Sequence, residues 1–140
     1  MNKELLYAEL LMDEGKRSKP YHDTVGKITI GIGRNLSDIG LREDEIQYLF
    51  NNDVDSVILD LNQHLPWWLD QPEPVQRALA NLCFNLGITK LLKFKNTLSC
   101  IKQGEYTLAV ENLKKSKWFK QVQRSRSARI FKLLMEGYVV

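Results

Sequence analysis

The spacing of apolar residues changes once along this chain, and that change restricts the possible folds more than any other feature. Apolar side chains recur at three- and four-residue steps over residues 42–65, which predicts an amphipathic helix of about six turns. Between residues 28 and 33, isoleucine instead alternates with threonine or glycine, a pattern typical of a short strand. The helical period also predicts shorter helices over residues 3–13, 74–86, 96–103, 106–114 and 125–136. The sequence therefore predicts an α+β fold that is mainly α.

The predicted elements indicate one domain over residues 1–140, made of two lobes. Residues 24–26 are typical of a tight turn, so we expect the strand to belong to a β-hairpin in a small lobe at about residues 14–45. The helix at about 42–65 would connect this lobe to a helical lobe. The helical lobe would consist of about residues 66–140 together with the N-terminal helix. A chain of 140 residues can bury a core without metals or disulfides. A cleft between the lobes is the expected place for a ligand.

The net charge of +3 conceals two halves of opposite sign. Residues 1–70 hold 7 Lys/Arg against 13 Asp/Glu, whereas residues 71–140 hold 13 against 4. Eight basic residues and no acidic one lie from Lys114 to Lys132. This run is either a solvated helical surface or a site for a polyanion such as nucleic acid, an anionic membrane or a cell-wall polymer. Few aromatic residues interrupt it, so we expect no nucleic acid partner.

Several classes of protein are disfavoured by the composition. The N-terminus carries four acidic residues within its first fourteen positions, so no secretory signal peptide is expected. No apolar run reaches the ~20 residues that a membrane-spanning helix needs. Neither His22 nor His64 has a partner at metal-ligand spacing, and Cys83 and Cys100 are expected to pack as free thiols. We therefore predict no metal and no cofactor.

Two carboxyl groups and a hydroxyl group stand out near the predicted strand. Glu14 is expected at the C-terminal end of the first helix, where unpaired carbonyls disfavour a negative charge, which suggests a functional reason for it. Asp23 follows nine residues later, and Thr29 lies on the glycine side of the strand, where a substrate could approach the backbone. Glycoside hydrolysis uses one protonated carboxyl group and one carboxylate that either directs a water molecule or attacks the sugar itself. Alternatively, both acids are ordinary residues of a turn and a helix end.

Three segments around these residues resemble the active-site region of the phage-type lysozymes. They are residues 13–15 (Asp-Glu-Gly), residues 21–26 (Tyr-x-Asp-Thr-x-Gly) and residues 29–33 (Thr-Ile-Gly-Ile-Gly). Further segments that resemble this family follow in order at residues 49–55, 84–87, 94–98 and 109–119. The resemblance extends over nearly the whole chain and implies a lysozyme-like fold.

The resemblance also implies an endolysin with muramidase activity. Such an enzyme hydrolyses the β-1,4 bond between N-acetylmuramic acid and N-acetylglucosamine in bacterial peptidoglycan and so lyses the host cell. By the family pattern Glu14 is the acid, Asp23 the second carboxylate and Thr29 the threonine that positions the water. The family resembles inverting glycosidases, whose carboxyl groups stand ~6.5–9.5 Å apart to admit that water. The alternative is a lysozyme-like module that binds peptidoglycan without cleaving it.

Four further residues match sugar-binding positions of the family: Asn35, Phe84, Thr97 and Asn112. Thr97 stands where a serine is found, which keeps the hydroxyl group, and Asn35 stands where leucine is found. Alternatively, Phe84 packs in the apolar core and Asn112 only forms local hydrogen bonds.

The chain differs from the family pattern at two places in the small lobe and matches it at one arginine of the last helix. Arg34 replaces a histidine of the family, so a structural ion pair of that histidine is expected to be lost. The segment between residues 33 and 49 is also shorter, which would trim the small lobe and open the cleft. In the family an arginine early in the last helix pairs with the catalytic acid. Arg126 matches it best, and Arg124 and Arg129 are the alternatives in neighbouring registers.

The resemblance finally implies partners and a place of action. We expect a monomer whose substrate is peptidoglycan and which a holin releases when lysis is due. The enzyme would then stay in the host cytoplasm until lysis and act afterwards in the periplasm or cell wall.

Overall fold

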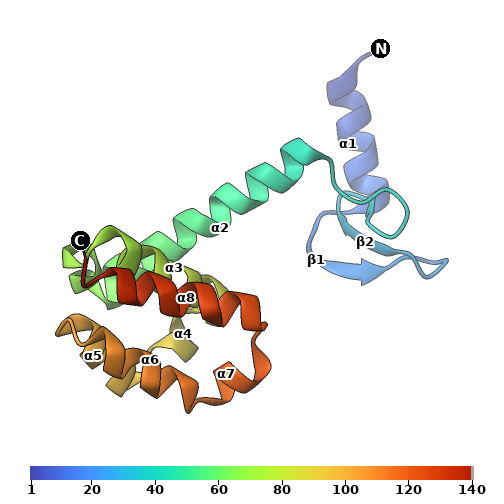
Figure 1. The fold of residues 1–140 in the computed structure, drawn as a ribbon. Coiled ribbons are helices and arrows are strands. Elements are labelled where there is room, and N and C mark those ends of the chain that lie inside the picture. Colours follow the sequence, from blue (N-terminus) through green and yellow to red (C-terminus); the bar gives the residue numbers. More distant parts are fainter. Residues whose placement is uncertain (140) are drawn as a thin grey trace. The chain divides into compact units, whose positions relative to one another are not determined.

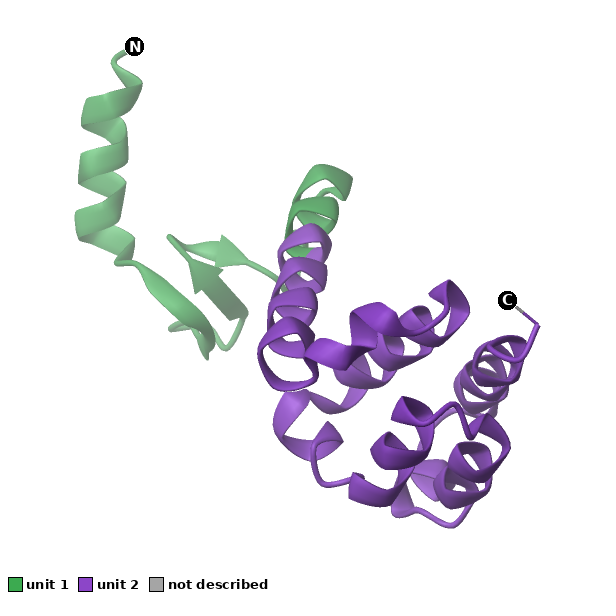
Figure 2. Ribbon diagram, turned by 90° about the vertical axis from the view of Figure 1, so that its left-hand side faces the viewer, with its two compact units in different colours: residues 1–49 green, residues 50–140 purple. Residues whose placement is uncertain are grey.

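The chain divides into two compact units, which we describe one at a time. The computed structural model describes residues 1–139. Internal contacts assign residues 1–49 to unit 1 and residues 50–140 to unit 2 (Figure 2). In the described residues helices predominate and all strands lie in unit 1 (Figure 1), which confirms the α+β, mainly α fold. Unit 1 contains the N-terminal helix, which the sequence pattern places with the helical lobe.

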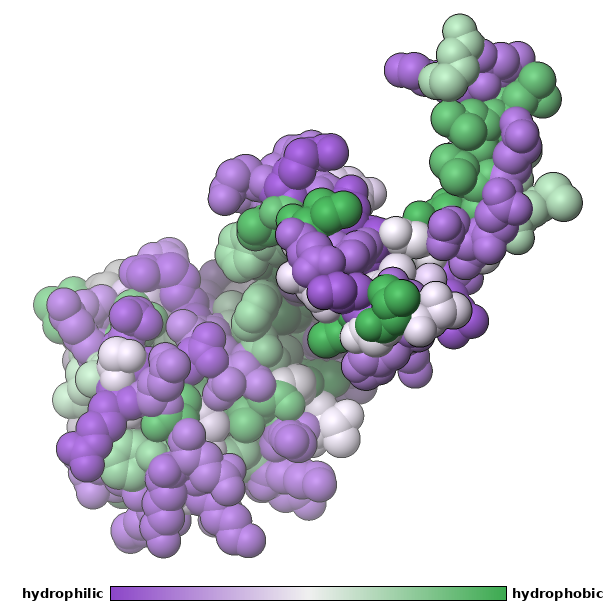
Figure 3. All heavy atoms as spheres, turned by 90° about the vertical axis from the view of Figure 1, so that its right-hand side faces the viewer, coloured by the Kyte–Doolittle hydropathy of each residue, from purple (hydrophilic) through white to green (hydrophobic). Residues whose placement is uncertain are grey.

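The first helix, α1 (Lys3–Glu14), follows the predicted helix to within one residue. The Asn2 side chain accepts a hydrogen bond from the Leu5 amide at 3.0 Å. At the other end Gly15 adopts a φ of 74°, and its amide donates to the Leu11 carbonyl at 3.0 Å. No residue of α1 is buried, and its apolar side chains are visible at the surface in Figure 3. Local capping therefore defines both ends of this helix.

Unit 1 contains a small sheet rather than a simple hairpin. The strands β1 (Arg17–His22), β2 (Ile28–Gly31) and β3 (Arg34–Asn35) form an antiparallel sheet in that order. Thr29 pairs with Tyr21 on one side and with Asn35 on the other. The third strand escapes prediction because two residues are too few for an alternating pattern.

The burial of β2 is unusual for a strand with alternating isoleucines. Thr29 is only 4% exposed and is the one buried residue described in unit 1, whereas Ile28 is 44% exposed. Thr29 pairs directly with Tyr21 and Asn35, so the side chains of these two residues flank it on the same face of the sheet. Unit 1 therefore has almost no apolar core of its own, so hydrogen bonds and ion pairs contribute a larger share of its stability.

The long helix α2 (Glu43–His64) matches the prediction and begins with an ion pair. Glu45 Oε1 accepts the Arg42 amide at 2.9 Å, which caps the helix, and it also accepts Arg34 Nη1 at 2.7 Å. Arg34 donates as well to the Gly40 carbonyl at 3.2 Å. The predicted loss of an ion pair at this position is thus offset, because Arg34 forms a different one with Glu45.

The Arg34–Glu45 pair should make the protein less stable in acid. The Arg34 guanidinium, followed by the Arg42 amide, lowers the pKa of Glu45 from 4.5 to about 2. A carboxylate with a lowered pKa stabilises the fold above its unfolded pKa, and this contribution is lost as the pH falls through the folded pKa. We expect Arg34→Met to lower the thermal unfolding midpoint most above pH 4.5, and the difference from the wild type to shrink below that pH and to vanish once the pH has fallen below about 2.

Glu45→Gln is the matched control for this prediction. Its amide oxygen can still accept the Arg42 amide, so the cap survives while the ion pair is lost. The midpoint should fall as in Arg34→Met, and combining the two substitutions should add little. A midpoint difference that does not depend on pH would contradict the assignment.

Unit 2 is a bundle of helices around the apolar core of the molecule. Its elements after α2 are η1 (Pro66–Asp70), α3 (Glu73–Leu86), α4 (Ile88–Leu91), α5 (Lys95–Lys102), α6 (Tyr106–Lys114), α7 (Lys117–Gln121) and α8 (Arg124–Glu136). The four longer helices after η1 match the predicted ones to within one residue, and α3 packs against α8 while α5 packs against α6. The short helices α4 and α7 are not predicted because they are too short to display a helical period.

The core of unit 2 contains leucine and isoleucine side chains from each of the longer helices. Those at most 1% exposed include Leu79, Leu82, Ile101, Leu113 and Leu134. Such side chains contribute roughly 1.5–3 kcal/mol each when fully buried. The core therefore holds α3, α5, α6 and α8 in place and fixes the positions of the polar residues they carry.

The cysteines are free, as predicted. Cys83 is buried and Cys100 half-buried. Burial raises the pKa of the Cys83 thiol, so this side chain stays protonated and packs as an apolar group. Within residues 1–139 no group of three metal-ligating side chains could hold a metal ion. None of the helices described there has both the length and the apolar character needed to cross a bilayer.

Candidate active site

Glu14 is the last residue of α1, and its side chain lies against the backbone of Gly33. A Cβ atom placed on Gly33 would come within 2.9 Å of Glu14 Cδ and 3.0 Å of Oε2. Gly33 belongs to the turn between β2 and β3. Within unit 1 the Glu14 carboxyl group has no hydrogen bond or ion pair. The carboxyl group thus sits beside the sheet, at a helix end whose carbonyls disfavour its charge.

Asp23 lies directly after β1 and holds the turn to β2. Its Oδ1 atom accepts the amides of Val25 at 3.0 Å and Lys27 at 2.8 Å, while its own amide donates to the Lys27 carbonyl at 2.9 Å. Among the described residues no donor reaches Oδ2. One oxygen of this carboxylate therefore fixes its orientation, and the other is available to a ligand.

Thr29 lies on β2, and its hydroxyl group donates to the Lys27 carbonyl at 3.1 Å. A hydroxyl group that donates its hydrogen can still accept one. Thr29 is more enclosed than the bare strand face predicted from the sequence, and its cross-strand neighbours are Tyr21 and Asn35. Glu14, Asp23 and Thr29 nevertheless all belong to unit 1.

Asn35 serves a local turn at the end of β3. Its Oδ1 atom accepts the Asp38 amide at 3.0 Å, and its Nδ2 atom donates to Asp38 Oδ2 at 3.1 Å. Asp38 is paired in turn with Lys27 at 3.2 Å. Both polar atoms of Asn35 thus have partners within unit 1, and its predicted contact with sugar stays a prediction.

Thr97 and Asn112 come together at a polar cavity in unit 2. Thr97 lies on α5 and Asn112 on α6, and both line a cavity of about 440 Å³. Thr97 is 3% exposed, whereas Asn112 is half-buried and directs Nδ2 toward Cys100 Sγ at 3.7 Å. The cavity is also lined by Lys93, Phe94, Lys95 and Asn96, none of which is predicted to bind sugar, although residues 94–98 form a segment that resembles the family. Their proximity to Thr97 in the sequence is the signal that could have found them.

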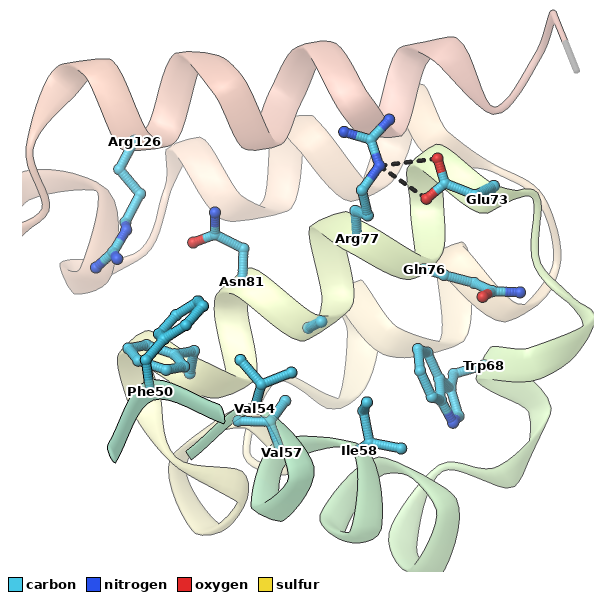
Figure 4. A pocket seen from close by; sticks show the side chains of 12 residues that line it. Phe50, Val54, Val57, Ile58, Trp68, Glu73, Gln76, Arg77, Asn81 and Arg126 are labelled. Carbon is cyan, nitrogen blue, oxygen red and sulfur yellow. Dashed lines mark hydrogen bonds and ion pairs between the residues drawn. The ribbon is translucent and has the colours of Figure 1, made fainter. Parts of the chain in front are cut away.

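Phe84 and Arg126 line a second cavity of unit 2, shown in Figure 4. Phe84 is 44% exposed, so it is not a core residue, and its ring centroid lies 6.1 Å from that of Phe50. The Asn81 Oδ1 atom at this cavity is buried and has no hydrogen-bond partner among residues 1–139. Arg124 lines a different cavity, and the choice among Arg124, Arg126 and Arg129 stays a prediction. The predicted partner of this arginine, Glu14, belongs to the other unit, so that pairing stays a prediction.

Comparisons with known proteins agree with the motifs around Glu14 and Asp23. The chain is 27% identical to the pre-baseplate central spike protein Gp5 of Enterobacteria phage T4, over 97% of its length but only 28% of the spike protein. It is 27% identical to probable T4-type lysozyme 1 of Dictyostelium discoideum, over 91% of this chain and 92% of that protein. It is 31% identical to the SAR-endolysin of bacteriophage PS119, over 73% of this chain and 62% of the endolysin. A sequence model of the family described as phage lysozyme matches residues 12–130. Because this match includes Glu14, Asp23, Thr29 and most of unit 2, the chain belongs to the phage lysozyme family.

Proposed function

We propose that this protein is a muramidase that hydrolyses the β-1,4 bond between N-acetylmuramic acid and N-acetylglucosamine with inversion at the anomeric carbon. Membership of the phage lysozyme family and similarity to an endolysin support lytic action on peptidoglycan. The finer assignment rests on one observation. Glu14, Asp23 and Thr29 occupy the positions of the family pattern in unit 1, and Asp23 is held there with one carboxylate oxygen free.

The proposed mechanism gives each of these side chains one task. The protonated Glu14 carboxyl group donates its proton to the leaving glycosidic oxygen. Asp23 Oδ2 accepts a proton from a water molecule, whose oxygen forms the new bond to the anomeric carbon from the opposite face. Thr29 Oγ1 accepts the second hydrogen of this water, because its own hydrogen is committed to the Lys27 carbonyl. The water then presents a lone pair to the sugar.

Mass analysis of digested peptidoglycan tests the reaction. Hydrolysis leaves reducing muramic acid ends, whereas a lytic transglycosylase leaves anhydro ends and an amidase or peptidase releases peptides. Proton NMR of the first products tests the stereochemistry, because inversion of a β bond yields the α anomer. Binding of peptidoglycan without any soluble fragment would favour a module that does not cleave. Release by a holin and a monomeric state stay predictions from the resemblance.

Thr97 and Asn112 should contribute to binding of the substrate rather than to the chemical step. Loss of one neutral hydrogen bond costs about 0.5–1.5 kcal/mol, so Thr97→Val and Asn112→Ala should each raise KM about 2- to 10-fold with little change in kcat. The measurement is steady-state kinetics on soluble peptidoglycan oligosaccharides.

Thr89→Val is the matched control for Thr97→Val, because Thr89 is an exposed threonine on α4 and does not line the polar cavity. Its KM should equal that of the wild type. A fall in kcat at unchanged KM in the Thr97 and Asn112 variants would argue against a role in binding.

A further inference from the structure

Gly33 differs from the other glycines that adopt a positive φ in the described chain. Its φ is +72°, a conformation that residues with a side chain rarely adopt. The others, Gly15, Gly26, Gly31, Gly40, Gly87 and Gly104, have no atom within 4 Å of the position where a Cβ would stand. At Gly33 the Glu14 side chain crowds this position, with Cδ at 2.9 Å and Cγ and Oε2 at 3.0 Å. The space that a side chain would occupy thus holds a carboxyl group instead.

If Gly33 acquired a side chain, the Glu14 side chain would have to move, because the turn that contains Gly33 is held more firmly. Glu14 is exposed, and within unit 1 its carboxyl group has no hydrogen bond or ion pair, so in this unit only packing against the turn holds it. Gly33 lies in the β2–β3 turn, next to the Arg34 that is paired with Glu45 and hydrogen-bonded to the Gly40 carbonyl. A methyl group on Gly33 would therefore displace the Glu14 side chain rather than the turn.

We propose that Gly33 is a positioning residue for Glu14, because the absence of a side chain at Gly33 leaves the space against which the Glu14 carboxyl group packs. This inference rests on the proposed function, in which the Glu14 carboxyl group is the proton donor. Displacement of a reacting group by about 1 Å can cost about 10²-fold in rate. In this proposal Gly33 thus acts through Glu14.

The test compares Gly33→Ala with Gly40→Ala. Gly40 also lies in unit 1 and has a φ of +69°, but no atom lies within 4 Å of its Cβ position, so this variant reports the cost of backbone strain alone. We expect similar decreases in the thermal unfolding midpoint for the two variants. We expect a loss of kcat about 10²-fold greater in Gly33→Ala than in Gly40→Ala. If Gly33→Ala fails to fold, Gly33→Asn and Gly40→Asn replace the pair, since asparagine tolerates a positive φ better.

A spectroscopic readout separates the position of the carboxyl group from its role in catalysis. The ¹³C resonance of Glu14 Cδ should move in the Gly33 variant and stay in place in the Gly40 variant. An unmoved resonance overturns the inference, whatever the activity. A moved resonance with an unchanged kcat overturns the positioning role as well. Failure of the proposed function would show separately, as full activity in Glu14→Gln.

Discussion

Glu14→Gln should abolish the loss of turbidity of a peptidoglycan suspension while the protein remains folded. A carboxamide has the shape of the carboxyl group but cannot donate its proton to the leaving oxygen. General acid catalysis typically contributes 10²–10⁴-fold, so we expect a decrease of about that size. The thermal unfolding midpoint should not decrease, since the substitution removes a negative charge from the C-terminal end of α1, where unpaired carbonyls disfavour it.

Asp13→Asn is the matched control for this experiment. Asp13 precedes Glu14 on the last turn of α1, and its substitution removes the same charge from the same helix end. We expect it to retain activity. Equal losses in the two variants would mean that charge at the helix end matters and that Glu14 has no specific role as an acid.

Asp23→Asn and Asp23→Ala should both lose activity but differ in stability. Asparagine keeps an oxygen that can accept the Val25 and Lys27 amides, so the turn between β1 and β2 survives. It cannot take a proton from water, and we expect kcat to fall about 10²–10⁴-fold. Alanine loses the same activity and also the two hydrogen bonds, which should lower the free energy of unfolding by about 1 kcal/mol or more.

Thermal unfolding and release of soluble glycan fragments separate these two effects. Asp44→Asn is the control. Asp44 is an exposed acid of unit 1 that forms an ion pair with Arg42, whereas Asp23 accepts hydrogen bonds from the amides of a turn. The Asp44→Asn variant should leave the rate of fragment release unchanged. An Asp23→Asn variant that still lyses peptidoglycan would refute the role of Asp23 as base, and the proposed mechanism would need another group to accept the proton.

Local features of the sequence determined the helices and the turn that carries Asp23. Helix periods and caps depend on residues within a few positions of each other, so α1, α2, α3 and α8 could be predicted to within one residue. The resemblance to lysozymes depends on short motifs, so the amino-acid sequence alone is enough to recognise the family. The short elements β3, α4 and α7 could not be predicted, because each contains too few residues to display a period.

Only the tertiary structure decided how residues distant in the chain meet. The sequence predicted a lost ion pair at Arg34, but the fold brings Glu45 within 2.7 Å of it. It marked Gly33 as part of a bare strand face, and the fold shows that the Glu14 carboxyl group fills the space beside it. Thr97 and Asn112 were predicted separately, and the packing of α5 against α6 places both at one cavity. Such contacts depend on how helices and strands pack, and a local period or motif contains no information on that packing.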